Sequence, residues 1–151
     1  MIHVKRSTSD IFSELKNSNI MASNPKTAKR LGSVIKLKPE MYQKYKDLHA
    51  AVWPEILKRI YDSNIRNYTI YYDKHHHLLF SHMEYIGDDL EKDMAAIGND
   101  PLTKKWWKVC EPCQESLEWT GPPPSEGGEG GNWWAPIEEV FHDGHPATHY
   151  H

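Results

Sequence analysis

Apolar and polar residues alternate over residues 30–38, and the spacing changes to a helical one after Pro39. In the stretch RLGSVIKLK, every second residue falls on one face of a strand: Leu31, Ser33, Ile35 and Leu37. Apolar residues then recur three or four positions apart, as on one side of a helix: Met41, Tyr45, Leu48 and Val52. Pro39 suits the first turn of that helix. The pattern therefore predicts a strand followed by an amphipathic helix.

Pro54 divides the helical pattern in two. Because proline lacks an amide hydrogen and clashes with the preceding turn, the helix should break near Trp53. A second helical piece should end near Asn64. Residues 66–86 then alternate again, and a short turn around Asp73 divides them into two strands. We expect a kinked helix followed by a β-hairpin.

Two further helices are predicted after the hairpin. In DDLEKDMAAIG, Asp88 and Glu91 have the spacing of a capping box, and Gly98 is the expected C-cap. The next helix has Asp100 at the N-cap and a proline at its first position. Pro112 should disturb the end of that helix.

A proline- and glycine-rich stretch over residues 120–132 predicts an irregular loop, and Ile137–His142 predicts a last strand. The element order is then β, kinked α, β, β, α, α, loop, β. This order matches the ferredoxin-like βαββαβ fold, an α+β architecture with a four-stranded antiparallel sheet and helices on one face. Residues 67–72 carry aromatic side chains on both faces of their strand, so the open face of the sheet needs a cover. We therefore expect a homodimer with stacked sheets, a dimeric α/β barrel.

The chain of 151 residues has room for one domain with a hydrophobic core. Residues 1–30 are rich in serine, asparagine and lysine and lack clear periodicity, so we expect a flexible N-terminal extension. The ordered domain should cover residues 31–143 and leave residues 144–151 as a loose tail.

The composition excludes several classes of partner. A net charge of −3 and a pI near 6.3 give no electrostatic footprint for nucleic acid or an anionic membrane. No apolar run approaches the roughly 20 residues that span a bilayer, and the N-terminus lacks the apolar segment of a secretory signal. Two cysteines without a disulfide framework favour a reducing compartment. We expect a cytoplasmic protein that binds neither nucleic acid nor membranes.

The cysteine and histidine clusters predict no metal or redox centre. Cys110 and Cys113 form a C-x-x-C motif, but it closes a helix instead of opening one, and no second pair completes a zinc site. Structural cysteines are the simpler interpretation. The three histidines His75–His77 lie at the hairpin turn, where neighbouring side chains point in different directions, so we expect a solvated turn.

Two tryptophan pairs are candidates for sugar binding: Trp106–Trp107 and Trp133–Trp134. Neighbouring residues on a helix point about 100° apart, so one indole of the first pair can pack while the other faces a cleft. Aromatic rings stack on the C–H faces of pyranoses, and the indole N–H can donate to a hydroxyl. Packing in the core or at an interface remains the alternative.

Tyr45, His49 and Trp53 fall on one face of the kinked helix. A histidine at the edge of an apolar stripe is either a packed residue or a proton shuttle, because its ordinary pKa lies near neutrality. Tyr45, one turn away, could hydrogen-bond the same ligand.

Four motifs, in this order and spacing, resemble the L-rhamnose mutarotase family over residues 31–142: YKDLHAAVWPEI at 45–56, NYTIYYDKHHHLLF at 67–80, KKWWKV at 104–109 and IEEVFH at 137–142. The resemblance implies a ferredoxin-like homodimer that interconverts the α and β anomers of L-rhamnose, or of a related 6-deoxy sugar, without a cofactor. The long insert before the last strand, the N-terminal extension and the histidine-rich hairpin depart from the family pattern.

By this resemblance, the family's proton-donating histidine falls on His49, its substrate-contacting tyrosines on Tyr45 and Tyr68, and its tryptophan pair on Trp106 and Trp107. Mutarotation needs a proton on the ring oxygen, loss of the anomeric hydroxyl proton, rotation of the freed aldehyde and reclosure. One positioned acid/base group contributes roughly 10²–10⁴-fold to such a reaction, which requires no metal or redox cofactor. Two other classes stay open: a non-catalytic ferredoxin-like module that binds a small ligand, and a haem or cofactor-free oxygenase of the same dimeric architecture.

Overall fold

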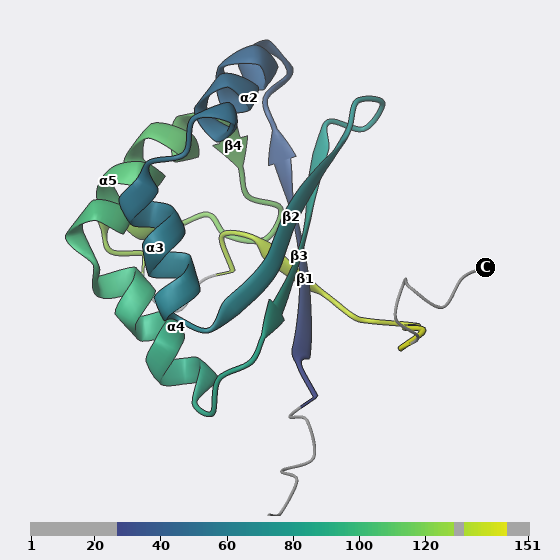
Figure 1. Ribbon diagram of the computed structural model, residues 1–151. Coiled ribbons are helices and arrows are strands. Elements are labelled where there is room, and N and C mark those ends of the chain that lie inside the picture. Colours follow the sequence, from purple (N-terminus) through teal and green to yellow (C-terminus); the bar gives the residue numbers. More distant parts are fainter. Residues whose placement is uncertain (1–26, 129–131, 145–151) are drawn as a thin grey trace, which may run out of the picture.

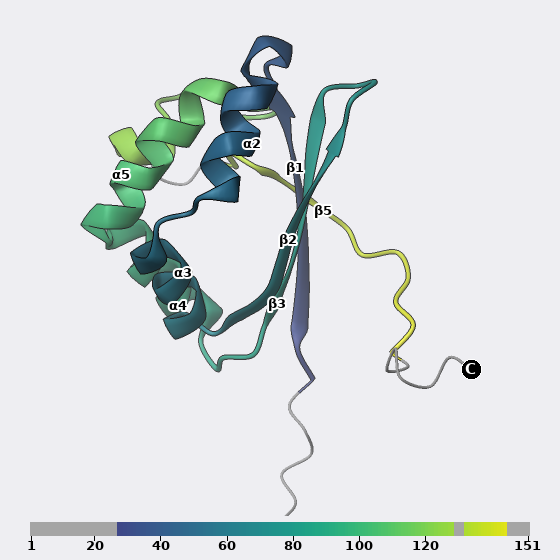
Figure 2. The same ribbon diagram turned by 45° about the horizontal axis from the view of Figure 1, so that its top comes forward.

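The computed structural model describes residues 27–128 and 132–144, which form an antiparallel sheet with helices on one face (Figures 1 and 2). The strands are β1 (Lys29–Leu37), β2 (Ile65–Asp73), β3 (Leu78–Tyr85), β4 (Gln114–Glu115) and β5 (Ala135–Ile137). The α-helices are α2 (Tyr42–Ala50), α3 (Pro54–Asp62), α4 (Leu90–Asn99) and α5 (Pro101–Cys110). Short 3-10 helices are η1 (Pro39–Met41), η2 (Glu111–Cys113) and η3 (Pro124–Glu126).

The strand order β2-β3-β1-β4 is that of the ferredoxin-like fold, and the predicted fold class is confirmed. β3 runs antiparallel along one edge of β1, from the pair Lys29–Tyr85 to the pair Lys36–Leu78. β4 and β5 both pair with the other edge of β1. Two short strands therefore share the place of the single fourth strand that the sequence predicted.

Proline residues end the helices where the sequence predicted. α2 ends at Ala50, Trp53 has an extended conformation (φ −60°, ψ 133°), and Pro54 begins α3. α5 ends at Cys110, and Pro112 lies in the 3-10 turn that follows. These breaks turn α2 and α3 along the same face of the sheet (Figure 2).

The predicted caps of α4 are wrong by one residue at the N-terminus and by two at the C-terminus. Asp89, not Asp88, caps this helix, because its carboxylate accepts a hydrogen bond from the Lys92 amide at 3.0 Å. Gly98 lies inside α4, which continues to Asn99. Asp100 is the N-cap of α5, as predicted, since its carboxylate accepts from the Thr103 amide.

The predicted last strand over Ile137–His142 is also wrong. The strand forms earlier, because the free edge of β1 pairs with Ala135–Ile137. Proline at position 136 is tolerated there since β5 pairs with β1 alone. Residues 138–144 form no strand, and Glu139 contacts β1 only through its side chain, which accepts hydrogen bonds from Arg30.

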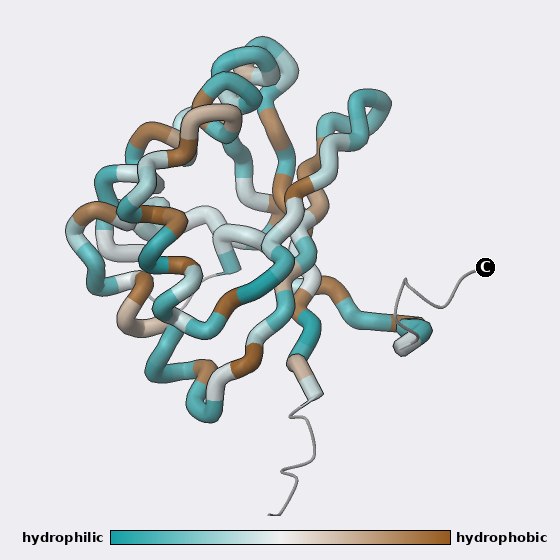
Figure 3. The backbone as a smooth tube through the Cα atoms, viewed as in Figure 1, coloured by the Kyte–Doolittle hydropathy of each residue, from teal (hydrophilic) through white to brown (hydrophobic). Residues whose placement is uncertain are grey.

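The hydrophobic core lies between the sheet and the helices. Ile35 and Leu37 of β1 and Leu79 of β3 are almost fully buried there. They pack with Ile56 of α3 and Trp106 of α5. Apolar residues recur along the strands and helices on both sides of this layer, whereas the tip of the β2–β3 hairpin is hydrophilic (Figure 3).

The predicted extension over residues 1–30 falls outside the described residues up to position 26. Lys29 already belongs to β1, so the ordered domain begins at least two residues before position 31. Residues 145–151 of the predicted tail also lie outside the described residues. Within the part of the chain that is described, every helix is too short or too polar to cross a membrane.

Candidate active site

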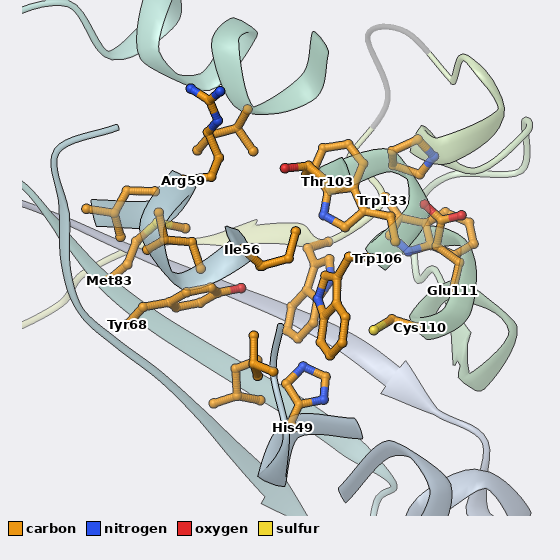
Figure 4. A pocket seen from close by; sticks show the side chains of 18 of the residues that line it. His49, Ile56, Arg59, Tyr68, Met83, Thr103, Trp106, Cys110, Glu111 and Trp133 are labelled. Atoms are coloured by element: carbon orange, nitrogen blue, oxygen red, sulfur yellow. The ribbon is translucent and has the colours of Figure 1, made fainter. Parts of the chain in front are cut away.

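A cavity of about 580 Å³ lies between the helices and the covered face of the sheet. Side chains from α2, α3, β2 and α5 line it, and residues after the proline- and glycine-rich loop close one side (Figure 4). The structure brings together all five residues that the family resemblance selected: Tyr45, His49, Tyr68, Trp106 and Trp107.

His49 is held in one orientation by its own helix. Its Nδ1 lies 2.9 Å from the carbonyl oxygen of Tyr45, one turn earlier in α2. Because a carbonyl only accepts, Nδ1 carries the proton and Nε2 is left with a free lone pair. The imidazole stacks on the Tyr45 ring at 4.2 Å and meets Trp106 edge-on at 5.5 Å between centroids.

The surroundings of His49 favour its neutral form. Burial among aromatic rings lowers the pKa of His49 below its ordinary 6.5, and the hydrogen bond to the Tyr45 carbonyl opposes this only in part. At neutral pH the imidazole is therefore uncharged: Nδ1 carries its proton and Nε2 can accept another. The imidazole points from α2 toward Trp106 (Figure 4).

Two phenols complete the polar part of the cavity. The Tyr68 hydroxyl points toward the middle of the cavity although the side chain as a whole is 43% exposed (Figure 4). Burial raises the pKa of Tyr68 to about 12 and raises the pKa of the buried Tyr45 as well. Both hydroxyls keep their protons at physiological pH, so both can donate hydrogen bonds to a ligand.

The two tryptophans of α5 differ in burial, as the helical geometry predicted. Trp106 is 6% exposed and packs edge-on against Trp53 at 5.3 Å, whereas Trp107 is half-buried. Both rings line the cavity. Their flat faces and the apolar residues around them suit a small ring with a methyl substituent.

Two further cavity residues, Gln114 and Glu111, were not singled out from the sequence. Gln114 of β4 is buried and hydrogen-bonds both Tyr45 and Trp133. Glu111 is buried and accepts from the amide of Ser125 at 2.9 Å and from its hydroxyl. A buried glutamine beside a C-x-x-C motif has no spacing signal, whereas Trp133 and Trp134, which also line the cavity, were candidates from the sequence.

A family model described as L-rhamnose mutarotase matches residues 30–143. The chain belongs to the L-rhamnose mutarotase family. This membership confirms the resemblance read from the four motifs, and with it the predicted class of enzyme, an isomerase that exchanges anomers.

Relatives of the L-rhamnose mutarotase family cover most of the ordered domain. An L-rhamnose mutarotase of Phocaeicola vulgatus is 32% identical over 70% of this chain and 89% of its own length. One from Lactiplantibacillus plantarum is 28% identical over 75% of this chain and 96% of its own length. The crystal structure of an L-rhamnose mutarotase from Formosa agariphila is 26% identical, with a TM-score of 0.59, over 76% of this chain and 98% of that one.

A second solved structure shares the fold alone. Tetracenomycin F2 cyclase from Streptomyces glaucescens is 13% identical, with a TM-score of 0.53, over 79% of this chain and all of that one. The ferredoxin-like architecture therefore serves different reactions, and the residues in the cavity distinguish them.

The cysteines of this mutarotase-family chain belong to the core. Cys110 and Cys113 are free thiols at 5% and 0% exposure, as expected of structural cysteines. Burial raises the pKa of Cys110 to about 12, the opposite of what a reactive thiol needs. Over residues 27–128 and 132–144, no three histidine, cysteine or acidic side chains gather closely enough to hold a metal.

Two of the hairpin histidines, His76 and His77, make hydrogen bonds within the hairpin itself. His76 pairs with Asp73 at 2.7 Å, and this contact holds the pKa of Asp73 down at about 2. The hydroxyl of Tyr72 lies 3.1 Å from Nδ1 of His77. Residues 73–77 do not line the cavity.

Proposed function

We propose that the chain interconverts the α and β anomers of L-rhamnose, or of a related 6-deoxy sugar, in this cavity, with His49 as the proton carrier. The observation that carries the assignment of His49 is its fixed tautomer: Nδ1 is engaged by a backbone carbonyl, and Nε2 is a neutral base among aromatic rings. A sugar hydroxyl at Nε2 would find an acceptor that can return the proton later.

The proton moves between two oxygens that share the anomeric carbon. Nε2 of His49 takes the proton of the anomeric hydroxyl while the bond from that carbon to the ring oxygen breaks. The resulting imidazolium gives the same proton to the former ring oxygen, which becomes a hydroxyl on the open-chain aldehyde. The aldehyde then turns about its bond to the next carbon, and the same steps in reverse close the ring as the other anomer.

The phenols contribute without ionising. Negative charge builds on the ring oxygen as its bond to the anomeric carbon breaks, and a hydrogen bond donated from Tyr45 lowers the energy of that state, whereas Tyr68 donates to another oxygen of the sugar and helps to hold it. Their raised pKa values keep both groups protonated and able to donate.

The apolar side of the cavity favours a sugar that ends in a methyl group. Val52, Ile56 and Met83 are among the lining residues. The hydroxymethyl group of an ordinary hexose would lose hydrogen bonds to water against such a surface, at a cost that a methyl group avoids.

Saturation-transfer NMR tests the proposal directly. Irradiation of the α-anomer signal of L-rhamnose should attenuate the β-anomer signal in proportion to the enzyme concentration. Binding of the sugar without exchange would favour the non-catalytic module, and oxygen consumption would favour the oxygenase.

We also propose that the protein is a cytoplasmic homodimer with a monosaccharide as its substrate. The two subunits would contact each other through the open face of the sheet. The free buried thiols suit a reducing compartment.

A further inference from the structure

Three side chains from distant segments form a chain of hydrogen bonds at the cavity. The indole Nε1 of Trp133 donates to Oε1 of Gln114 at 2.8 Å. Nε2 of Gln114 in turn lies 3.3 Å from the Tyr45 hydroxyl. Gln114 and Tyr45 are each 6% exposed, so water does not compete freely for these bonds.

The indole N–H of Trp133 fixes the donor and acceptor of both hydrogen bonds, from Trp133 to Gln114 and from Gln114 to Tyr45. An indole N–H only donates, so the atom of Gln114 that faces it must be the oxygen. The amide NH₂ therefore faces Tyr45, and the phenol oxygen must accept from it. No other described side chain hydrogen-bonds the Tyr45 hydroxyl. Its own proton is thus left to point into the cavity that Tyr45 lines.

The proline- and glycine-rich insert holds the first donor in place. Ser125 in η3 is tied to the buried Glu111 through its amide and its hydroxyl. At the other end of the insert, the Ser116 hydroxyl donates to the carbonyl oxygen of Asn132, the residue before Trp133. Ser125 is therefore fixed to Glu111 after α5, and Asn132 to Ser116 after β4, so Trp133 enters the cavity next to an anchored residue (Figure 4).

We propose that Gln114 and Trp133 are positioning residues that make Tyr45 a hydrogen-bond donor to an oxygen of the sugar. This inference rests on the proposed function and assigns a role to the insert. Without the amide, the phenol could rotate and present its lone pairs to the substrate, where the ring oxygen needs a donor.

Replacing Gln114 by glutamate reverses the direction of the hydrogen bond with Tyr45 and hardly changes the shape of the side chain. In Gln114→Glu one carboxylate oxygen still accepts from Trp133, but the other accepts from Tyr45 and draws its proton away from the cavity. At pH 7 we expect kcat/KM for anomer exchange to fall about tenfold or more, the scale of one hydrogen bond to a charged or reacting group. Gln114→Met, which leaves the phenol free to rotate, should lower kcat/KM by a smaller factor.

A double-mutant cycle with Tyr45→Phe separates orientation from packing. Phenylalanine has no hydroxyl to orient, so Gln114→Glu should cost little in the Tyr45→Phe background. An equal loss in both backgrounds would mean that Gln114 only packs, and the inference would be overturned. If Gln114→Glu does not fold, Trp133→Phe gives the same comparison, because it removes the donor that fixes the amide.

The pH dependence provides a second readout. As pH falls from 7 to 5, the buried carboxyl of Gln114→Glu protonates and can again donate to Tyr45. The ratio of its kcat/KM to that of the wild type should therefore rise, and a constant ratio would contradict the inference. The wild-type exchange rate, measured in the same NMR experiment, reports separately on the proposed function, since its absence would sink that proposal whatever the variants do.

Discussion

At the scale of single residues, His49 shows how packing decides a protonation state. The imidazole is half-buried against the ring of Tyr45 and the edge of Trp106, and its Nδ1–H donates a hydrogen bond to a backbone carbonyl. The same residue on a solvated helix face would be partly protonated near neutrality.

His49→Ala should abolish the proton shuttle while leaving the fold intact. We expect anomer exchange of L-rhamnose to slow by about two orders of magnitude, the usual scale for one lost acid/base group. Saturation-transfer NMR gives the rate, and circular dichroism with a melting curve checks the fold. Lys44→Ala, an exposed position on the same helix, is the matched control. Wild-type exchange in His49→Ala would remove His49 from the mechanism.

The fall of kcat/KM at low pH should result from protonation of His49. Its pKa is lowered from 6.5, so the neutral base is already present at neutral pH and is lost only as pH falls through that lower value. The value of kcat/KM should therefore stay level above pH 6.5 and decline below it, after subtraction of the uncatalysed rate. A limb centred above pH 6.5 would show that a different group titrates.

Tyr68 and Trp107 should matter more for holding the sugar than for moving its proton. Tyr68→Phe removes a hydroxyl that points into the cavity, and Trp107→Ala removes a half-buried ring from its wall. Each should raise KM several-fold with a smaller change in kcat, which steady-state kinetics would separate. A loss confined to kcat in Tyr68→Phe would instead assign its phenol to the proton transfer.

At the scale of elements, the sequence predicted what proline and alternation control. The break before Pro54 and the end of α5 near Pro112 were predicted because proline acts through its own backbone. The short strands β4 and β5 were missed or misplaced, since their limits depend on which residues of β1 are free to pair.

In the site, too, the sequence predicted some residues and missed those whose contacts depend on tertiary packing. The five residues of the family motifs were predicted, because resemblance carries positions that the fold must bring together. The contact of Gln114 with Tyr45 joins residues 69 apart in the chain, and neither its spacing nor its neighbours signal it. Such a contact exists only once the sheet and α2 have packed.

The insert should depend on one buried carboxylate. Ser125→Ala removes a hydroxyl that donates to Glu111, which is 7% exposed, while the backbone amide of residue 125 still donates. We expect the free energy of unfolding to drop by about 1 kcal/mol. A rise in KM should accompany it, because Trp133 loses support. Urea denaturation of Ser125→Ala beside Glu126→Ala, an exposed neighbour in η3, measures the difference; equal stability of the two would mean that the anchor contributes nothing.

At the scale of the whole molecule, the sheet has one covered face and one open face (Figures 1 and 2). Ile35 and Leu79 point to the helices, so their neighbours in sequence point away from them. Across the open face, Phe80 pairs with Tyr71 on one side and with Val34 on the other. These three residues form an apolar row, and Tyr71 is 66% exposed.

The segment after β5 adds to this surface. Val140 and Phe141 are 93% and 83% exposed, and the chain there runs out from the open side of the sheet (Figure 2). Exposed apolar side chains that continue an apolar sheet face are typical of an interface. A second copy, turned about a two-fold axis, would present the same row and the same segment and would cover both at once.

We therefore expect light scattering after size exclusion to give about twice the chain mass of 17.6 kDa. The double variant Val140→Asp with Phe141→Asp should elute at the mass of one chain, because four charges would be buried in the dimer without partners. Leu102→Asp, on α5 in the helical layer, should stay dimeric. A wild-type monomer at micromolar concentration would contradict the dimer, and a dimeric double variant would place its contacts elsewhere. If the variant is monomeric and still exchanges anomers at the wild-type rate, each subunit holds a complete site.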